Sequence, residues 1–198
     1  MRPVGIREFV RPSRIAAVLS VLIGLGLAPL QADAAQRSDQ YNMQEVIDAG
    51  HGFFGSASGA FAKVVEKAFQ DYGLPNGYIL GQDGAGAFIA GLTYGEGTLY
   101  TKNAGEHDVF WQGPSLGLDY GGSGSRAMML VYDLPSVDAL YTRFGGVSGS
   151  AYVLAGVGMT VMKNNDMVLV PIRTGVGARL GINVGYLKLT QKPTWNPF

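Results

Sequence analysis

The sequence predicts a mainly β protein, a small antiparallel β-barrel with two N-terminal helices and one short helix inserted between strands. Three observations support this fold class. From Asn76 onward, apolar and polar residues alternate with a period of two, which is typical of strands with one buried face. Short reversals rich in Gly and Asn separate these runs, and tight reversals connect antiparallel strands. From Arg173 to Lys188, glycine or a polar residue alternates with an apolar one, and such glycine-rich strands indicate sharp bending.

The first 34 residues have the three parts of a secretory signal peptide. Four arginines between positions 2 and 14 precede an uncharged apolar block at 15–30, and Ala32 and Ala34 supply the cleavage pattern, so we expect cleavage after Ala34. The alternative is a membrane anchor, but this block is shorter than the roughly 20 residues that span a bilayer. We therefore expect a periplasmic protein with no stable transmembrane segment after cleavage, with residues 35–40 as a linker and 41–198 as one domain.

Two helices are expected before the strands. The first begins at a cap formed by Ser38 or Asp39 and ends near Ala49. The second follows a cap at Ser58 and ends at Gly73. Its apolar residues recur at the helical spacing of three and four: Phe61, Val64, Val65, Ala68, Phe69 and Tyr72. This stripe predicts packing on the domain's own sheet, and the alternative is contact with a membrane surface or a partner.

Nine strands are expected near 78–82, 85–94, 98–102, 109–112, 116–120, 126–132, 148–162, 167–172 and 175–190. Turns are expected at Glu96-Gly97, at 121–124 and at 163–166, and a short helix at 136–144. The glycine-rich run from Arg173 is roughly 60 Å long at about 3.3 Å per residue. That is too long for one straight strand of a small domain, so we expect a bend or a bulge in it.

Composition excludes several classes of function. The absence of cysteine excludes disulfides, thiol nucleophiles and thiolate metal sites. Of the 15 basic and 15 acidic residues, four basic and two acidic ones lie in the signal peptide, so the mature chain carries a net charge of about −2. A chain without a basic excess is not expected to bind nucleic acid.

The sequence contains no convincing catalytic or metal-binding motif. The segment 113–117 matches G-x-S-x-G, but a nucleophile elbow requires a helix after the serine, and an alternating strand pattern follows Ser115. His51 and His107 both lie in expected turns. The acids beside His107 are its sequence neighbours, and consecutive turn residues rarely converge on one ion. We expect no enzymatic activity, no metal and no cofactor.

Polar residues on the strand face that carries glycine and polar residues, called the small face here, remain as candidates for ligand binding. Arg173 and Arg179 share this face of the last run, and Asp119 lies on the small face of its own strand. An arginine inside a barrel must pair with a carboxylate or meet an anionic ligand, because an isolated buried charge is costly. The partner is a carboxylate of Asp83, Asp119 or Asp133, or the headgroup of a ligand. The two arginines are about 20 Å apart along a strand, too far to clamp one phosphate.

Several segments resemble a known lipid-binding domain. The segments 113–122 and 127–140 resemble two strands of the SYLF domain, one rich in glycine, serine and aromatic residues and one leading into a short helix. Pro171-Ile172-Arg173-Thr174 resembles the tyrosine-serine-arginine-serine segment of that domain, which maps its motif arginine onto Arg173. The whole chain, signal included, is still more similar to the EipA family, envelope integrity protein A, of Gram-negative bacteria.

The resemblance to the EipA family implies a SYLF-like periplasmic barrel that is not an enzyme and maintains cell-envelope integrity, with a lipid or another amphiphile as its ligand. Under this hypothesis Arg173 contacts the headgroup or the ligand at the barrel rim, and Arg179, Arg126 and Asp119 form the polar lining or its pairing network. A second hypothesis is a structural or interaction protein with a filled barrel that binds a cell-wall or outer-membrane partner. A third, an integral outer-membrane barrel, is disfavoured by two prolines in the last six residues.

Overall fold

The computed structural model describes residues 39–55, 59–83, 92–114, 126–174 and 185–196. They belong to a unit of tertiary contacts that spans Ser38–Phe198. Helices α2 (Met43–Phe54) and α3 (Gly59–Tyr72) precede the strands, and the short helix α4 (Val137–Leu140) is inserted among them. Within these ranges, no helix has the length and apolar character needed to cross a membrane.

Ten strands of the described part form a single sheet. They are β1 (Gly77–Asp83), β2 (Leu92–Thr101), β3 (Gly105–Pro114), β4 (Arg126–Tyr132), β5 (Arg143–Gly146), β6 (Tyr152–Leu154), β7 (Val157–Met159), β8 (Met162–Asn164), β9 (Met167–Thr174) and β10 (Tyr186–Thr190).

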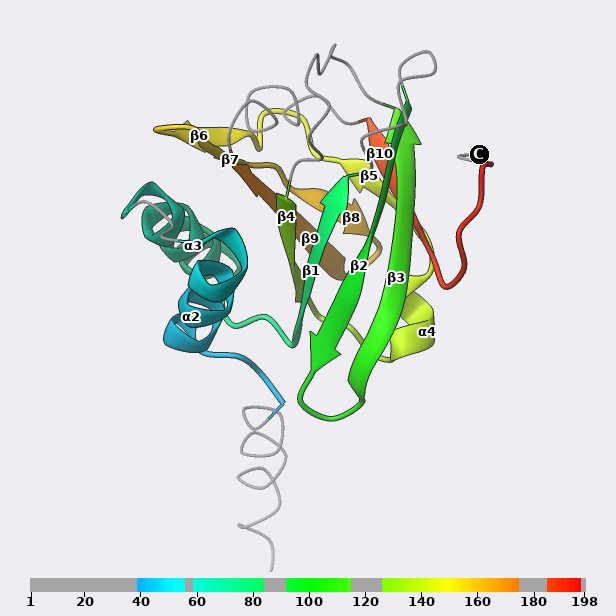
Figure 1. Ribbon diagram of the computed structural model, residues 1–198, viewed down its shortest axis with the longest axis horizontal. Coiled ribbons are helices and arrows are strands. Elements are labelled where there is room, and N and C mark those ends of the chain that lie inside the picture. Colours follow the sequence, from blue (N-terminus) through cyan, green and yellow to red (C-terminus); the bar gives the residue numbers. More distant parts are fainter. Residues whose placement is uncertain (1–38, 56–58, 84–91, 115–125, 175–184, 197–198) are drawn as a thin grey trace, which may run out of the picture. The chain divides into compact units, whose positions relative to one another are not determined.

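Eight of these strands close into an antiparallel barrel. Their order is β4-β1-β2-β3-β10-β5-β8-β9, and the pairing of β9 with β4 closes the ring. Strand β8 pairs with the first half of β9, while β7, followed by β6, pairs with its last residues and continues the sheet outside the ring (Figure 1). The predicted fold class, an antiparallel barrel with two N-terminal helices and one inserted helix, is confirmed.

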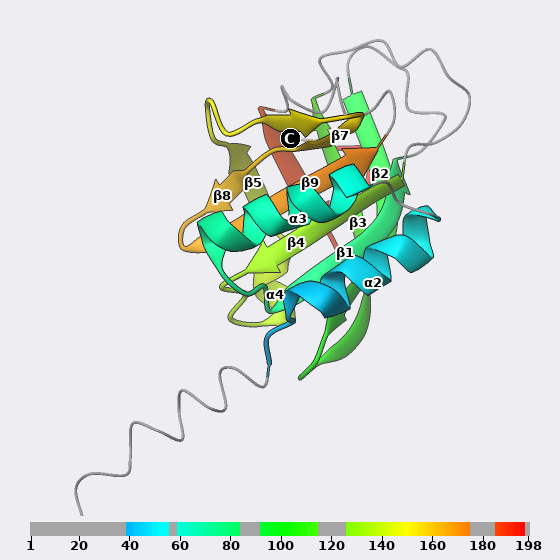
Figure 2. The same cartoon turned by 90° about the vertical axis from the view of Figure 1, so that its left-hand side faces the viewer.

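The strands at the closing seam are buried on both faces because helices cover them from outside (Figure 2). In β4, the odd-numbered residues from Ala127 to Val131 belong to the apolar cluster inside the barrel, and the even-numbered ones from Met128 to Tyr132 belong to the cluster beneath the helices. Such two-sided burial explains why β4 reads as a continuous apolar run.

Helix α3 packs on the domain's own sheet, as its apolar stripe predicts. Phe61, Val64 and Val65 are fully buried in the cluster that also contains the outer residues of β4 and β9. Burial of each such side chain contributes about 1.5–3 kcal/mol to folding. This face is therefore occupied by the sheet, and the alternative of contact with a membrane or a partner does not apply to it.

Helix α2 begins later than predicted. Its cap is Asn42, whose side-chain oxygen accepts a hydrogen bond from the Glu45 amide at 3.0 Å, while the Asn42 amide donates to the Glu45 carboxylate at 2.7 Å. This reciprocal capping box satisfies two amides at the helix start. The cap expected at Ser38 or Asp39 is therefore wrong: Asp39 precedes the helix start, and Ser38 lies outside the described residues.

Helix α2 also ends later than predicted, because Gly50 serves packing and not termination. The helix predicted to end near Ala49 continues to Phe54. A Cβ atom at position 50 would overlap the ring of Phe61 on α3. Glycine at this position allows the two helices to approach closely.

The turn expected at Glu96-Gly97 is wrong, because β2 runs without interruption from Leu92 to Thr101. Gly97 lies opposite Gly81 of β1 in the sheet register. A Cβ on Gly97 would overlap the backbone of Leu80 and lie 2.8 Å from the Gly81 Cα. The glycine signals a close approach of two strands, which local sequence cannot distinguish from a turn.

Two further segments are divided differently from the prediction. The run 148–162 contains two strands, β6 and β7, because Ala155 and Gly156 both have positive φ, as a two-residue hairpin turn requires. The helix expected at 136–144 is only α4, since Arg143 to Gly146 pair with β10 and β8 as β5. A hairpin reversal is present in the turn expected at 163–166, but only Asn165 and Asp166 form it, since Lys163 and Asn164 belong to β8; Asn165 occupies the left-handed region.

The glycine-rich run does not form one strand that starts at Arg173. Arg173 and Thr174 end β9, which pairs with β4, whereas Tyr186–Thr190 form β10, which pairs with β3 and β5. The two strands have different neighbours in the ring, so they are separate elements. Residues 175–184 lie outside the described residues, as do the expected strand at 116–120, the turn at 121–124 and the cap at Ser58.

Gly97→Ala should destabilise the barrel by about 1–3 kcal/mol, because the added Cβ meets backbone atoms that cannot move aside. Gly145→Ala is the matched control, since its Cβ would have only the Lys163 carbonyl within reach, at 3.9 Å. Urea unfolding followed by circular dichroism measures both changes. Equal stability of the two variants would contradict the close approach of β1 and β2.

Stability should fall at alkaline pH as buried tyrosines ionise. Burial first, then the charges of Tyr78 and Glu45, raise the pKa of Tyr41 from 10.0 to about 12. Burial also raises the pKa values of Tyr78, Tyr132 and Tyr141.

Because the native state holds these protons more tightly than the unfolded chain, their stabilising contribution is complete below pH 10.0 and is lost as the pH rises towards about 12. Urea unfolding at successive pH values should give a falling free energy of unfolding over this interval. A constant free energy across it would count against the burial of these phenols.

Candidate functional site

Arg173 on β9, Asp83 at the end of β1 and Trp111 on β3 meet inside the barrel. Arg173 Nε lies 3.0 Å from Asp83 Oδ2, and Trp111 Nε1 donates a hydrogen bond to Asp83 Oδ1 at 2.8 Å. All three occupy odd positions, the face of these strands that carries the interior cluster. Arg173 is 6% exposed and Trp111 is fully buried, so the ion pair and the indole form a polar contact within an apolar interior.

The carboxylate of Asp83 compensates the buried positive charge of Arg173. Of the three carboxylates expected as partners, Asp83 forms the ion pair with Arg173. Asp133 is exposed and lies at a position of positive φ just after β4, and Asp119 lies outside the described residues. A charge that is already paired does not require an anionic ligand for its neutralisation.

Glycines beside Trp111 make room for its indole. Across the sheet, Gly95 of β2 is the register partner of Asp83 on one side and of Trp111 on the other. A Cβ on Gly95 would overlap the indole, and one on Gly81 would lie 2.6 Å from its Cη2 atom. Because these positions carry no side chain, the indole passes over β2 and reaches the carboxylate.

Side chains fill the interior between the described strands. The interior cluster includes Ile79, Leu99, Met129, Leu169 and Leu187, all at 0–1% exposure, packed together with Trp111. These side chains occupy the described interior, as in other protein cores. Two depressions lined by described residues lie on the outer face of the barrel.

A polar groove of about 660 Å³ crosses the outer face of β1, β2 and β3 beside the end of helix α2. Seven side chains with polar, charged or aromatic groups line its wall: Phe53, Gln82, Glu96, Thr98, Asp108, Phe110 and Arg126. The even-numbered strand residues among them point outward, opposite to the interior face. The groove thus combines two carboxylates, one guanidinium, an amide, a hydroxyl and two aromatic rings.

An apolar slot of about 340 Å³ adjoins this groove and lies beneath the C-terminal segment. Its apolar wall is formed by Tyr94, Phe110, Pro193 and Trp195, and it shares Gln82, Glu96 and Phe110 with the polar groove.

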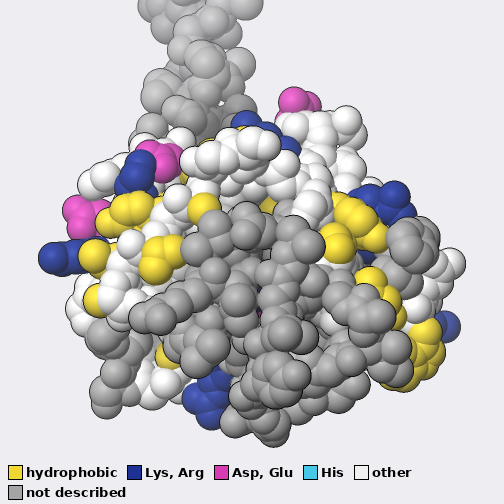
Figure 3. Space-filling view, turned by 90° about the horizontal axis from the view of Figure 1, so that it is seen from above, with side chains coloured by type: hydrophobic (Ala, Val, Ile, Leu, Met, Phe, Trp, Pro, Cys, Tyr) yellow, Lys and Arg dark blue, Asp and Glu magenta, His cyan; other side chains and the backbone are white. Residues whose placement is uncertain are grey.

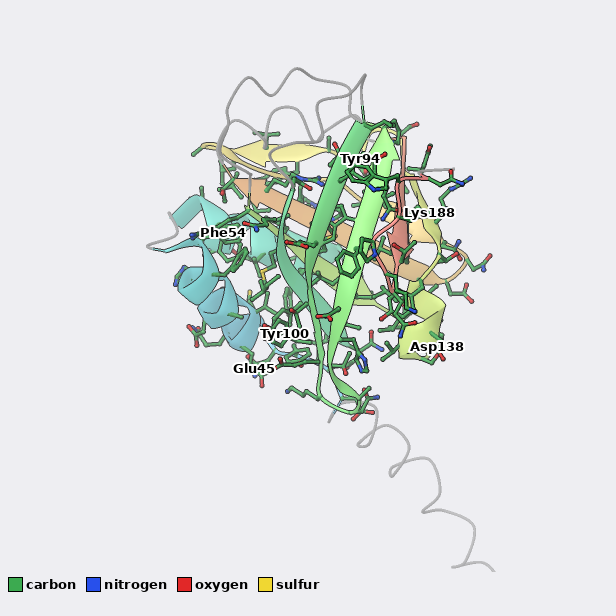
Figure 4. The ribbon with its side chains drawn as sticks, turned by 45° about the vertical axis from the view of Figure 1, so that its right-hand side comes forward. Glu45, Phe54, Tyr94, Tyr100, Asp138 and Lys188 are labelled. Carbon is green, nitrogen blue, oxygen red and sulfur yellow. The ribbon has the colours of Figure 1, made fainter. Side chains whose placement is uncertain are left out.

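The C-terminal segment is held against the barrel by specific contacts. Tyr94 donates its hydroxyl hydrogen to the Trp195 carbonyl at 3.0 Å, and the two rings are 5.2 Å apart. Lys188 Nζ donates to the Asn196 carbonyl at 3.1 Å. Figure 4 shows Tyr94 near one end of β2, with Tyr100 near the other, and Lys188 on the neighbouring part of the barrel. The slot is therefore a formed feature of the surface.

The described surface offers mixed chemistry and no metal cluster. No group of three His, Cys, Asp or Glu side chains within the described ranges could hold a metal ion. Viewed from the end at which β1 terminates, hydrophobic side chains lie next to Lys or Arg side chains on both flanks (Figure 3). Such surfaces suit ligands that have both polar and apolar parts.

The model of the EipA family, envelope integrity protein A, matches residues 39–198. The chain belongs to the EipA family. Among solved structures, a β-barrel-like, uncharacterized protein from Brucella abortus is 68% identical, with a TM-score of 0.77, over 80% of this chain and 99% of that one. No curated protein matches the chain.

The four site residues expected from the sequence do not form one cluster in the described part of this EipA-family chain. Arg173 lies inside the barrel, but Arg126 lies on the outer face, where its Nη1 donates to the Phe53 carbonyl at 2.6 Å and its guanidinium lies 5.6 Å from the Phe53 ring centre. Arg126 and Arg173 therefore lie on opposite faces of the sheet, and a ligand-binding role of Arg126 stays a prediction. Arg179 and Asp119 lie outside the described residues.

Sequence reasoning missed the aromatic residues that define both environments. The role of Trp111 could not be predicted from local sequence, because its partners Asp83 and Gly95 are distant in sequence. Trp195 could have been identified from the sequence, because a tryptophan in a polar tail between two prolines is not expected to enter a core. In the structure it is 83% exposed, and its ring contacts Tyr94. An isolated aromatic residue in such a tail indicates a contact residue.

Arg173→Met should cost about 3–5 kcal/mol of stability, because it removes one partner of a buried ion pair. The double variant Asp83→Asn/Arg173→Met should recover much of this loss, since the asparagine oxygen still accepts from Trp111. Lys67→Ala is a surface control, whose exposed pair with Asp71 is worth about 0.3–0.5 kcal/mol.

Urea unfolding of the single, double and control variants measures these free energies. Full stability of Arg173→Met would contradict the structural role of the pair.

Proposed function

We propose that the protein maintains the cell envelope from the periplasm as a non-enzymatic protein that binds a lipid or another amphiphile on the outside of its barrel. Membership of the EipA family supports the envelope role. The secretory signal predicted at residues 1–34 supports the periplasmic location. The single observation that carries the ligand proposal is an apolar slot joined to a polar groove through three shared residues.

An amphiphile needs apolar volume next to polar partners, and the two adjoining depressions supply both. The slot offers the rings of Tyr94, Phe110 and Trp195 to an alkyl chain. Burial of apolar surface contributes about 25 cal/mol per Å², so a chain that covers an exposed indole gains substantial free energy. The polar headgroup then lies in the groove, where it has hydrogen-bond partners.

This proposal moves the ligand from the interior to the surface. The buried pair of Arg173 with Asp83 and the packed interior favour a supporting role for Arg173. They also favour a second candidate, a filled barrel that uses its surface to contact a cell-wall or outer-membrane partner. The two candidates differ in whether a single-chain amphiphile binds at the slot.

Trp195 provides the test, because the chain has two tryptophans and the other, Trp111, is fully buried. Dodecylphosphocholine below its micellar concentration should shift Trp195 emission to the blue, and Trp195→Phe should abolish this shift. Tyr94→Ala should weaken binding about tenfold, equivalent to about 1.4 kcal/mol, because it removes the ring and the hydroxyl that hold the C-terminal segment.

Tyr100→Ala is the matched control, since Tyr100 points outward from the same strand but is not a wall residue of the slot or the groove (Figure 4). Absence of any shift, or equal affinities of the Tyr94 and Tyr100 variants, would overturn the amphiphile proposal. Cross-linking that captures a cell-wall or outer-membrane component without any amphiphile would then support the second candidate.

A further inference from the structure

The polar groove contains a charge pattern that its ligand must match. Its described walls carry the carboxylates of Glu96 and Asp108 and the guanidinium of Arg126 as their charged groups. Neither carboxylate forms an ion pair within the described residues, and both residues are exposed. The walls therefore have a net negative charge, which opposes a phosphate or carboxylate headgroup.

The guanidinium is not free to change this balance. Arg126 Nη1 already donates to the Phe53 carbonyl at 2.6 Å, and the group lies over the Phe53 ring. An arginine that captures an anion commonly presents its planar fork to two oxygens. Here that fork is partly used to fix the end of helix α2 against β4, so a strong anion site is not formed.

A cationic headgroup fits the groove poorly as well. A quaternary ammonium group has no hydrogen-bonding atoms, so the amide of Gln82 and the hydroxyl of Thr98 would lose contact with water and gain nothing. The net negative charge of the walls favours a cation, so it is the unmet hydrogen bonds of Gln82 and Thr98 that disfavour this headgroup. The groove favours a ligand that is uncharged and makes many hydrogen bonds.

Sugars have this chemistry. Each hydroxyl both donates and accepts, so it can donate to the carboxylates of Glu96 and Asp108 and accept from Gln82 or Thr98. The rings of Phe53 and Phe110 on the walls can contact the apolar C–H face of a pyranose. The groove therefore has the mixture of aromatic surface and few polar groups that fixes the orientation of a small ligand.

A buried acceptor in the adjoining slot supports a hydroxyl-bearing ligand independently. Gln112, on the slot wall, is 1% exposed, and its amide oxygen has no hydrogen-bond partner among the described residues. A buried acceptor without a hydrogen-bond donor lowers the stability of the fold. A hydroxyl donor that reached the junction of slot and groove would remove this cost.

We infer that the polar groove on the outer face of β1–β3 binds an uncharged sugar, with the neighbouring slot holding an attached alkyl chain where there is one. This inference rests on the proposed function and names the chemistry of its headgroup. Two sources have that chemistry, a glycolipid and a free glycan chain, and they differ in whether the slot contributes to binding.

The experiment compares headgroups on one tail. Dodecyl maltoside, dodecylphosphocholine and dodecyltrimethylammonium, each below its micellar concentration, are titrated into the mature protein, with Trp195 emission as the readout and calorimetry as a check. The maltoside should bind at least tenfold more tightly than the other two. Equal affinities for the three headgroups would overturn the sugar inference and leave the amphiphile proposal standing.

A variant within the groove tests the location. Asp108→Ala should weaken maltoside binding about tenfold and leave the affinity for dodecylphosphocholine unchanged or raised, because Asp108 lines the groove but not the slot. Asp138→Ala on helix α4 removes an equal exposed charge outside both depressions and should change neither affinity (Figure 4). Unchanged maltoside affinity in Asp108→Ala would overturn the inference.

Free maltose distinguishes the sources. If maltose competes with dodecyl maltoside at comparable concentrations, the ligand is a glycan chain, and if it competes only at concentrations hundreds of times higher, the ligand is a glycolipid. Both results support sugar recognition. Maltose binding without any binding of the three dodecyl amphiphiles would overturn the amphiphile proposal alone.

Discussion

The indole of Trp111, which lies inside the barrel and donates to Asp83, is the constraint on which the rest of the fold depends. Its position requires Gly95 beside it, because any Cβ there would overlap the ring. The same carboxylate compensates Arg173, so one side chain satisfies an indole and a guanidinium in an otherwise apolar interior. Glycines that look costly in isolated strands are stabilising here, because they allow this packing.

The strand period of two links this interior to the outer surface. On β3, Trp111 points inward, so its neighbours on either side, Phe110 and Gln112, belong to the outer face. On β1, Asp83 faces the interior and Gln82 faces the groove. A shift of one residue in the register would exchange the two faces, so the packing that fills the barrel also fixes the outer groove.

Helices and the C-terminal segment divide the outside of the barrel between them. In Figure 1, α2 and α3 lie on the side of β4 and β9, away from β3. The C-terminal segment crosses the face of β2 and β3 and forms the apolar slot with Tyr94 and Trp195. The described interior is packed with side chains, and the polar groove and the apolar slot both lie on the outer face of the strands.

The sequence by itself determined the fold class, the apolar stripe of α3 and the EipA resemblance, because each depends on local periodicity or on motifs in order along the chain. It also limited the partners of Arg173 to a short set that contained Asp83. Only the tertiary structure decided that Gly97 marks a close strand approach and not a turn, that Arg126 lies outside the barrel, and that Trp195 forms a slot with Tyr94. These facts depend on which residues meet across strands that are far apart in sequence, and no local pattern encodes that pairing.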